Sequence, residues 1–121
     1  MKIVTPQKKK ESKTEEPDVA KITEIKDSFV EVDSFLHEPI RLQIMTYLNA
    51  VEKADMIFLK NMLNITWGNL SFHTTKLEEK EYLQIKKTFI AKKPHTIIQI
   101  TEKGKNKFED YRKAMKNFLQ K

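Results

Sequence analysis

Residues 82–101 contain the pattern that most restricts how this chain can fold. The segments YLQIKKTFI and HTIIQIT are rich in β-branched and aromatic residues, and the basic stretch AKKP separates them. Two such runs around a short turn predict a β-hairpin. A chain of 121 residues has room for one small domain with extensions, so the remaining segments have to pack around this hairpin.

Helical periodicities precede and follow the predicted hairpin. Apolar residues recur at spacings of three and four over residues 18–36 and again over residues 102–121, which predicts an amphipathic helix near each end. Pro39 suits the first turn of a helix containing PIRLQIMTYLNAV, because a proline at that position loses no hydrogen bond.

Small polar residues mark the expected helix ends. Asp55 is expected to cap a short helix that Asn64 closes, and Thr66 to cap the next helix, which runs to about Lys80. Thr101 is the corresponding cap of the last helix. The order is therefore four helices, a strand, a basic turn, a strand and a helix. Three compact helices before a hairpin predict a winged helix-turn-helix, whose third helix enters the DNA major groove.

The predicted fold class is mainly α with a small β-hairpin (α+β), with extra helices at both ends of the winged helix-turn-helix. Residues 1–17 are polar and charged, and are expected to form a disordered basic tail because they hold too few apolar groups for a core. Three further segments are expected: an N-terminal amphipathic helix at 18–36, the winged-helix domain at 37–101 and a C-terminal helix at 102–121.

Charge and composition narrow the range of partners. The formal net charge is +6 and the pI is near 9.4, which favours an anionic partner. The chain has no cysteine, which excludes disulfides, thiolate metal sites and cysteine nucleophiles. No apolar run approaches the roughly 20 residues of a membrane span, and the N-terminus lacks the apolar stretch of a signal peptide. An intracellular protein without a membrane partner is expected.

Three separated segments carry a family resemblance: FLHEPIRLQIMTYL, LKNMLNITWGNLSFHTTKLEEKEYL and KKPHTIIQITEKGKNKFEDY. Together, over roughly residues 33–115, they resemble the winged-helix DNA-binding domains of prokaryotic transcriptional regulators related to the arsenical-repressor and multiple-antibiotic-resistance-repressor families. The chain is most similar to a group with Gly-Asn-Leu-Ser-x-His in the recognition helix and Thr-Glu-Lys-Gly after the wing. The resemblance implies a dimeric DNA-binding regulator that uses residues 68–76, within the helix expected at 66–80, as recognition helix and residues 90–95 as wing. We expect such a regulator to be cytoplasmic and nucleoid-associated.

Two positions depart from the family pattern. The family usually has glycine before the tyrosine that starts the first wing strand, where this chain has Glu81. Because glycine accepts a left-handed backbone at a helix end, Glu81 implies a different helix exit or a strained one. Ala91 likewise stands at the wing tip where the family tends to have glycine, which leaves the geometry of that turn open.

The predicted recognition helix has two faces. Leu70, Thr74 and Leu77 share one face, with His73 at its edge, and are expected to be core. The other face presents groups that can bond bases or phosphates, or contact a thymine methyl. An ordinary solvated helix is the alternative interpretation. The candidate DNA-binding residues on this helix are Asn69, Ser71, Phe72, Thr75 and Lys76.

The predicted wing concentrates basic residues: Lys86, Lys87, Lys92, Lys93 and His95 lie within ten positions. Such a cluster suits phosphate contact, although lysines also protect a solvated hairpin from aggregation. Lys87, Lys92, Lys93 and His95 are therefore added to the candidate DNA-binding set.

Arg41 completes the candidate DNA-binding set, either as a phosphate contact or as the partner of Glu38. Trp67 is expected to be partly buried at the start of the recognition helix, since large aromatic side chains usually contribute to a core.

The sequence contains no pattern of catalytic or metal-binding residues. The three histidines, at positions 37, 73 and 95, lack the spacing of a metal site. There is also no glycine-rich phosphate loop and no evident pair of nucleophile and base. We therefore expect no cofactor and no enzymatic activity, and no feature of the sequence specifies a small-molecule effector.

The two terminal helices are expected to join two chains. Residues 17–40 carry two lysines against six acidic groups, and residues 102–121 carry seven basic against three acidic groups, so the helices can pack together within one chain or between two. We expect a homodimer with recognition helices about 34 Å apart, one DNA turn. In the alternative, both helices cover a single monomer. The candidate dimerisation residues are Ile22, Ile25, Phe29, Val32, Phe108, Tyr111, Met115, Phe118 and Leu119.

The leading functional hypothesis is a homodimeric transcriptional regulator that binds double-stranded DNA. The alternative is a winged helix that binds another protein through exposed Phe72 and Trp67, or that binds RNA, without sequence-specific readout of DNA.

Overall fold

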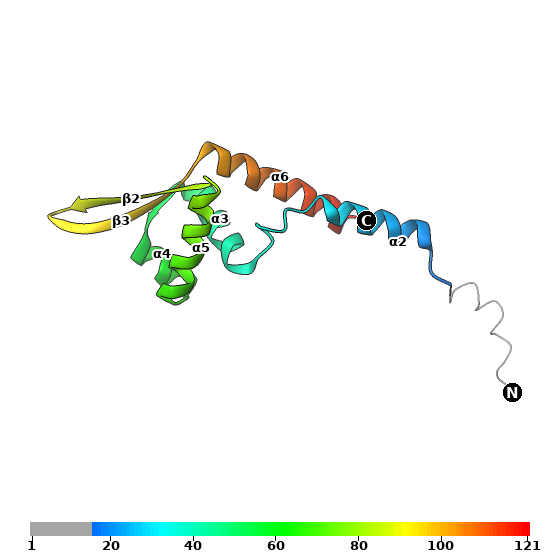
Figure 1. Cartoon of the computed structure of the whole chain (residues 1–121), viewed down its shortest axis with the longest axis horizontal. Coiled ribbons are helices and arrows are strands. Elements are labelled where there is room, and N and C mark those ends of the chain that lie inside the picture. The colour runs from blue at the N-terminus through cyan, green and yellow to red at the C-terminus, as the bar shows by residue number, and fades with distance from the viewer. Residues whose placement is uncertain (1–15) are drawn as a thin grey trace, which may run out of the picture.

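The computed structural model describes residues 16–121, so the expected basic tail lies outside the described residues except for Glu16 and Pro17. The α+β fold class and the order of the predicted elements are confirmed, and Figure 1 shows their arrangement. The elements are α2 (Val19–Val30), α3 (Pro39–Val51), β1 (Lys53–Asp55), α4 (Met56–Leu63), α5 (Trp67–Glu79), β2 (Leu83–Ile90), β3 (Lys93–Ile100) and α6 (Glu102–Leu119).

The sheet has three antiparallel strands in the order β1-β3-β2, whereas the sequence predicted only the hairpin of β2 and β3. Strand β1 is three residues long, Lys-Ala-Asp, and has no local strand pattern. It forms because its backbone pairs with the outer edge of β3, with Ala54 opposite Ile98. The prediction of a two-stranded hairpin is therefore corrected to a small three-stranded sheet.

The hairpin turn is tighter than the stretch AKKP suggested. Ile90 pairs with Lys93, so only Ala91 and Lys92 lie outside the strands, and both have a left-handed backbone, with φ of 51° and 67°. Two consecutive positive φ angles are the geometry of a type I′ turn, which matches the twist of the flanking strands. Ala91 therefore keeps a turn conformation that usually selects glycine or asparagine.

A single apolar core lies where α3, α4 and α5 meet one face of the sheet (Figure 1). The predicted caps fix the helix starts: the side chains of Asp55, Thr66 and Thr101 accept hydrogen bonds from backbone N–H groups of α4, α5 and α6. Asn64 ends α4 in the left-handed conformation, as predicted. Large side chains with no exposed surface include Leu36, Ile44, Met45, Leu48, Leu59, Leu70, Leu77 and Ile98.

The N-terminal helix is shorter than predicted, because α2 ends at Val30 and not at residue 36. The carboxylate of Asp33 accepts hydrogen bonds from the backbone N–H groups of Phe35 and Leu36, which organises a turn in place of a further helical turn. Val32 and Leu36 are buried in the domain core instead of lying on the helix seam.

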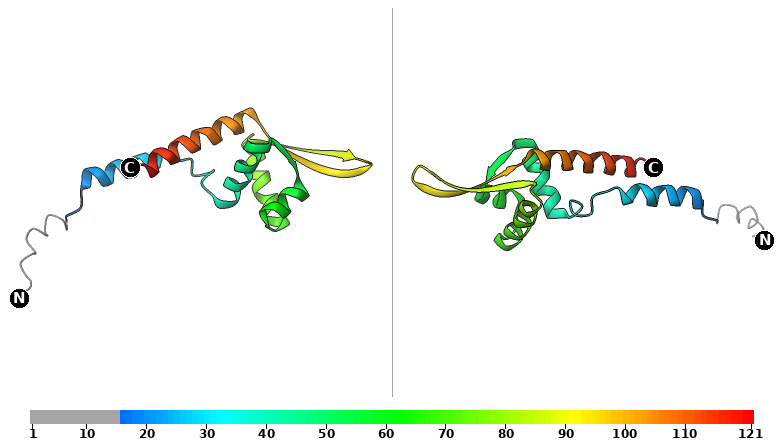
Figure 2. Two further views of the ribbon diagram at one scale, coloured as in Figure 1. Left: turned by 180° about the vertical axis from the view of Figure 1, so that it is seen from behind. Right: turned by 45° about the horizontal axis from the view of Figure 1, so that its top comes forward.

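Helices α2 and α6 run side by side, away from the three-stranded sheet (Figure 2). The ring centroids of Phe29 and Phe118 lie 4.8 Å apart, and Lys121 Nζ lies 3.5 Å from Glu24 Oε2. His37 Nδ1 is hydrogen-bonded to the Tyr111 hydroxyl at 2.8 Å. The acidic front helix therefore packs on the basic last helix within one chain, which is one of the two arrangements expected from the sequence.

Helix α5 ends in a strained backbone conformation at Glu81, which is one of the two alternatives that the sequence left open. Glu81 has φ of 66°, its N–H donates to the Glu78 carbonyl, and the N–H of Tyr82 donates to the Leu77 carbonyl. This pair of hydrogen bonds is the Schellman motif, which normally places glycine at the left-handed position.

Within residues 16–121, no helix is both long and apolar enough to cross a membrane.

Candidate nucleic-acid interface

Helix α5 separates a buried face from an exposed one, as the sequence predicted. Leu70, Thr74 and Leu77 are completely buried, and His73 is buried beside them. The Thr66 hydroxyl caps the helix by accepting from the Asn69 N–H at 3.1 Å. The five candidate DNA-binding residues of the helix all lie on its exposed face: Asn69, Ser71, Phe72, Thr75 and Lys76.

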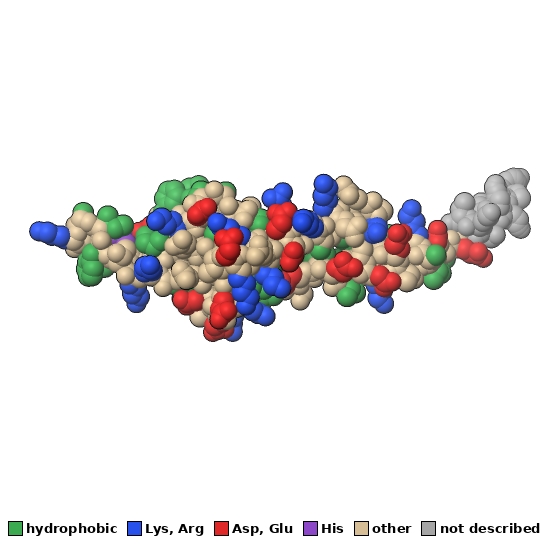
Figure 3. Space-filling model, turned by 90° about the horizontal axis from the view of Figure 1, so that it is seen from above, with side chains coloured by type: hydrophobic (Ala, Val, Ile, Leu, Met, Phe, Trp, Pro, Cys, Tyr) green, Lys and Arg blue, Asp and Glu red, His purple; other side chains and the backbone are tan. Residues whose placement is uncertain are grey.

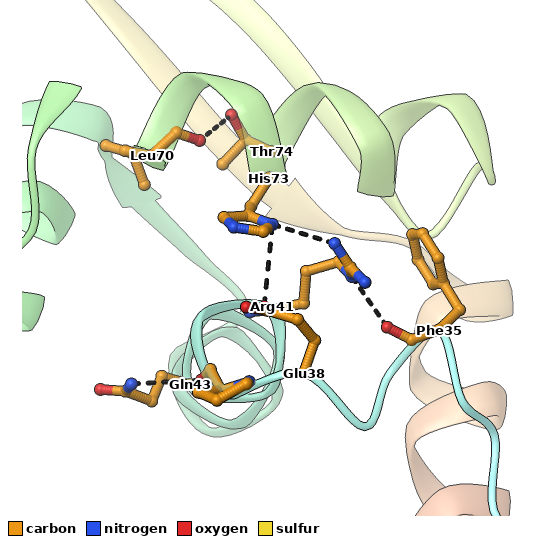
Figure 4. Close-up of polar contacts among 8 residues, drawn as sticks. Phe35, Glu38, Arg41, Gln43, Leu70, His73 and Thr74 are labelled. Atoms are coloured by element: carbon orange, nitrogen blue, oxygen red, sulfur yellow. Dashed lines mark hydrogen bonds and ion pairs between the residues drawn. The ribbon is translucent and has the colours of Figure 1, made fainter. Parts of the chain in front are cut away.

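His73 connects helix α5 to α3 through Arg41 (Figure 4). The Arg41 Nη1 atom lies 3.0 Å from His73 Nδ1, and Arg41 Nε donates to the Phe35 carbonyl at 2.8 Å. Because a guanidinium can only donate, His73 Nδ1 is the acceptor in this contact. The Arg41 side chain also lies over the Phe35 ring, 4.4 Å from its centroid.

The two alternatives for Arg41 were a phosphate contact and a pair with Glu38. In the structure Glu38 Oε1 accepts from the backbone N–H of Arg41 at 2.7 Å, and lies 3.7 Å from His73 Nδ1. Glu38 therefore caps α3, while the guanidinium bridges the chain before α3 to α5. Arg41 is only partly exposed and holds α5 against the domain.

The exposed face of α5 has only weak internal contacts. Lys76 Nζ lies 5.6 Å from the Phe72 ring centroid and 3.8 Å from a carboxylate oxygen of Glu79. Such surface pairs contribute little to stability and exchange easily with another partner. Phe72 is 55% exposed, so an aromatic ring and a cation lie together on this surface.

Trp67 is less buried than expected, with 49% of its surface exposed at the start of α5. Lys60 Nζ of α4 lies 5.5 Å from its ring centroid, a cation–π arrangement. Gly68 beside it faces open space, because a Cβ atom there would meet nothing nearer than the Thr66 hydroxyl at 4.0 Å. The N-terminal end of α5 is therefore an accessible surface.

The hairpin projects past the helices (Figure 1), and its lysine side chains are exposed. Lys86, Lys87, Lys92 and Lys93 are all exposed along the two strands and their turn. Figure 3 shows basic and apolar side chains together at this end of the molecule.

His95 differs from the lysines, because its Nδ1 atom is hydrogen-bonded to the Asp55 carboxylate. This bond is the main cause of the lowered pKa of Asp55, to which the Ile57 N–H adds. Asp55 also caps α4 by accepting from that N–H at 2.8 Å. Sequence reasoning missed the pair, since the two residues are 40 positions apart and meet only because β1 joins the sheet.

The dimerisation candidates divide into three groups by burial. Val32, Phe108 and Tyr111 are buried in the core of this chain, and burial raises the pKa of the Tyr111 hydroxyl, with Asp33 adding to the effect. Ile22, Phe29 and Leu119 are exposed, and Ile25, Met115 and Phe118 are partly buried, Phe118 through its contact with Phe29 of α2. In the described part of the chain, no three His, Asp or Glu side chains come together to hold a metal ion.

Comparisons with known proteins match this arrangement. The sequence profile of the winged helix DNA-binding domain family matches residues 40–119. An uncharacterised protein of Methanocaldococcus jannaschii is 40% identical over 72 residues, which cover 60% of this chain and 78% of that protein.

Solved structures show the same fold. A structure described as a transcriptional regulator homologue from Pyrococcus horikoshii OT3 superposes with a TM-score of 0.70 at 28% identity, covering 82% of this chain and 93% of that chain. Wild-type MarR from E. coli, in its apo form, superposes with a TM-score of 0.58 at 12% identity, covering 87% and 84%. The second likeness concerns the fold alone.

Proposed function

The chain belongs to the winged helix DNA-binding domain family, as its three motifs predicted, and on that premise we propose that it is a homodimeric transcriptional regulator of double-stranded DNA. Helix α5 enters the major groove, and the wing, residues 90–95, follows the backbone or minor groove. The observation that carries this proposal is the exposure of one polar, acceptor- and donor-rich face of α5 beside a wing of lysines. The Pyrococcus protein, described as a transcriptional regulator homologue, supports the same role.

The exposed face of α5 has the chemistry of base readout. Asn69 can form two hydrogen bonds with adenine, and Lys76 can bond guanine or a phosphate. Ser71 and Thr75 can bond bases or phosphates, and Phe72 can contact a thymine methyl. Core packing of Leu70, Thr74 and Leu77 holds these groups in a fixed orientation.

The wing and Arg41 have different tasks. Lys87, Lys92 and Lys93 are free to neutralise phosphates, which releases counterions and makes binding depend on salt. His95 is held by Asp55, so it anchors the wing to α4 at the same time as it borders the DNA. Arg41 acts on DNA mainly by positioning α5 through His73.

The dimer rests on the outer surface of α2 and the end of α6. Val19, Ile22, Val30 and Leu119 are large apolar side chains left exposed there. A patch of this kind marks an interaction site, and a second copy of the same surface is a suitable partner, since it buries both patches by symmetry. Pairing two chains also places two recognition helices on successive DNA turns.

Duplex binding is tested by removing wing charges. We expect the variant Lys92→Ala with Lys93→Ala to bind a mixed-sequence duplex more weakly and to reduce the slope of log affinity against log salt by about 2. The control variant, Lys107→Ala with Lys113→Ala, removes the same charge from exposed positions on α6 and should leave the slope close to the wild-type value. Absent or salt-insensitive duplex binding by the wild-type chain would refute the proposal.

Base readout is a separate claim with its own experiment. Preferred sites are first selected from random duplexes, and Asn69→Ala is then compared with the wild type on selected and scrambled sites. We expect Asn69→Ala to lose about 1 to 3 kcal/mol on the selected site and much less on the scrambled one. An equal loss on both sequences would show that Asn69 contacts only the backbone.

A second candidate function is supported by the half-exposed Trp67 and Phe72 rings. Aromatic side chains of this kind are common anchors in protein interfaces. This result would favour the second function, a winged helix that docks another protein or binds RNA: the chain does not bind duplex DNA, but substitution of Trp67 or Phe72 still abolishes its function in cells.

A further inference from the structure

The outer end of the β2–β3 hairpin, which includes the wing and the adjacent residues of β2, carries large apolar side chains in addition to its lysines. Phe89 is 74% exposed and Ile90 is 51% exposed, although both lie in a strand. A phenylalanine side chain left in water forgoes the favourable free energy that its burial would contribute. The stability of the domain does not explain Phe89, so the position calls for a partner.

Strand alternation gives the direction in which Phe89 points. Side chains two residues apart share a face of the sheet, so Phe89 lies on the same face as Leu83 and Ile85. Leu83 is buried against the helices, and α5 packs on β2 from this side. Opposite Phe89 on the paired strand is Pro94. Beyond the helices, the wing therefore presents Lys87, Phe89 and Pro94 on the side where α5 stands.

The charge around Phe89 identifies the chemistry of its partner. Residues 82–101 contain four lysines and no aspartate or glutamate. The nearby carboxylate of Asp55 is already bonded to His95. A partner that fits this surface is a polyanion with an apolar crevice between its charges. The DNA minor groove meets both requirements, because sugar edges and stacked base steps lie between its two rows of phosphates.

We infer that Phe89 is an apolar wedge that enters the minor groove at a base step while Lys87 and the tip lysines hold the flanking phosphates. This inference rests on the proposed function and adds a residue that reads DNA without hydrogen bonds. Phenylalanine and proline are among the side chains that minor-groove proteins insert between base steps, which unstacks and kinks the duplex. Phe89 and Pro94 are both of this kind.

The wedge makes binding sensitive to the deformability of DNA. Pyrimidine–purine steps such as TA unstack easily, whereas A-tracts are stiff. Alternating TA sequence should therefore accept Phe89 at a lower cost than a homopolymeric A-tract of the same length and composition. Such a preference would add specificity at positions where the wing makes no base-specific hydrogen bond.

The test compares two short duplexes of equal length, one of alternating TA sequence and one of homopolymeric dA·dT. We expect the wild type to prefer the alternating duplex by about fivefold to tenfold, and Phe89→Ala to lose this preference, by analogy with base-stacking losses of roughly 1 kcal/mol or more. Phe89→Leu, which keeps an apolar wedge, should retain most of it. Because Phe89→Ala removes no charge, its salt slope should equal that of the wild type.

Phe58→Ala is the matched control, because it removes an exposed phenylalanine from α4. It should keep the preference for the alternating duplex. End-to-end fluorescence transfer on the same duplexes gives a second readout, in which the wild type shortens the alternating duplex more than Phe89→Ala does.

The outcomes separate the wedge from the proposed function. If the wild type binds neither duplex, the proposed function fails. If it binds both and Phe89→Ala keeps the preference and the bend, only the wedge is overturned. The wedge is also overturned if Phe89→Ala instead weakens binding to oligouridylate or to phosphatidylserine-containing vesicles and leaves duplex binding unchanged.

Discussion

The winged-helix body and the two-helix arm of this chain are built differently. The body, residues 32–111, has a core of large apolar side chains with no exposed surface, among them Leu36, Ile44 and Leu70, and fixes its helix starts with side-chain caps. The arm, formed by α2 and the second half of α6 (Figure 2), packs on itself through Phe29 and Phe118 but leaves Val30 and Leu119 mostly exposed. The body therefore has its core within one chain, whereas the arm leaves apolar surface that we propose is covered by a second copy.

The largest expected effect comes from the point where α6 joins the body. The first turn of α6 lies against the backbone of Tyr82, and a Cβ atom on Gly104 would lie 2.2 Å from the Tyr82 carbonyl oxygen. Because neither backbone can yield without disturbing the exit of α5, Gly104→Ala should destabilise the chain by about 3 kcal/mol. Denaturant unfolding followed by circular dichroism measures this loss.

Gly68→Ala is the matched control, since Gly68 is the other of the two glycines and also lies in a helix. Its added Cβ atom meets open space, so the change should stabilise the chain slightly, by up to about 0.5 kcal/mol. Equal effects of the two substitutions would show that α6 does not press on Tyr82 in solution.

The next effect concerns the arm alone. Ile22→Asp with Val30→Asp places two charges on exposed apolar positions of α2. We expect the dimer dissociation constant to rise by about a hundredfold or more, because charges would be buried without partners in the interface. The stability of the body, measured at a concentration where the chain is monomeric, should change by less than about 0.5 kcal/mol.

Sedimentation measures the dimer, and Lys107→Ala is a suitable control because it changes an exposed charge on α6. If the wild-type chain sediments as a monomer at micromolar concentration, the exposed apolar surface of the arm does not join two copies.

The same comparison shows which parts of the fold could be read from the sequence. Asp55, Thr66 and Thr101 cap helices through bonds to residues two or three positions away, so local patterns predicted them. The end of α2 was predicted wrongly, because the spacing of apolar residues continues through Val32 and Leu36 although the helix does not.

Long-range pairing explains the other differences. Strand β1 has no strand-like composition and exists only through its pairing with β3. The contact between His95 and Asp55 depends on that strand, and the contact between Arg41 and His73 depends on how α3 crosses α5. Local periodicity cannot supply such information, whereas the family motifs predicted the helix within residues 66–80 and the turn within residues 90–95 without it.

A smaller effect is expected at the pair that ties the wing to the body. The pKa of Asp55 is lowered mainly by its bond to His95, so the pair stabilises the folded chain above the ordinary carboxyl pKa. This contribution decreases once the pH falls below the ordinary carboxyl pKa, and it is lost as the pH falls through the lowered pKa that Asp55 has in the folded state. Asp55→Asn keeps a capping side chain but loses the charge, and should cost about 1 kcal/mol at neutral pH.

The pH dependence of stability tests whether the charge of Asp55 causes this loss. The stability difference between wild type and Asp55→Asn should shrink as the pH is lowered past the carboxyl pKa, because protonated Asp55 resembles asparagine. Urea unfolding at several pH values measures it. A difference that stays constant with pH would attribute the loss to packing and not to the charge.

The smallest effect tests the strained exit of α5. Glu81 adopts φ of 66° at the left-handed position of a Schellman motif, where glycine meets no steric penalty. Glu81→Gly should stabilise the body by about 0.5 to 1 kcal/mol, the relief of strain being partly offset by the entropy of an unfolded glycine. The side chain itself contributes little, since its contact with Lys103 is a 3.5 Å pair between two exposed groups.

Glu81→Ala removes the same side chain but keeps the strain, so it should give no gain. Thermal unfolding of the three chains decides between backbone and side chain, and a gain for alanine equal to that for glycine would exclude strain as the cause. Because the change lies in the body, the dimer dissociation constant should stay at the wild-type value in both variants.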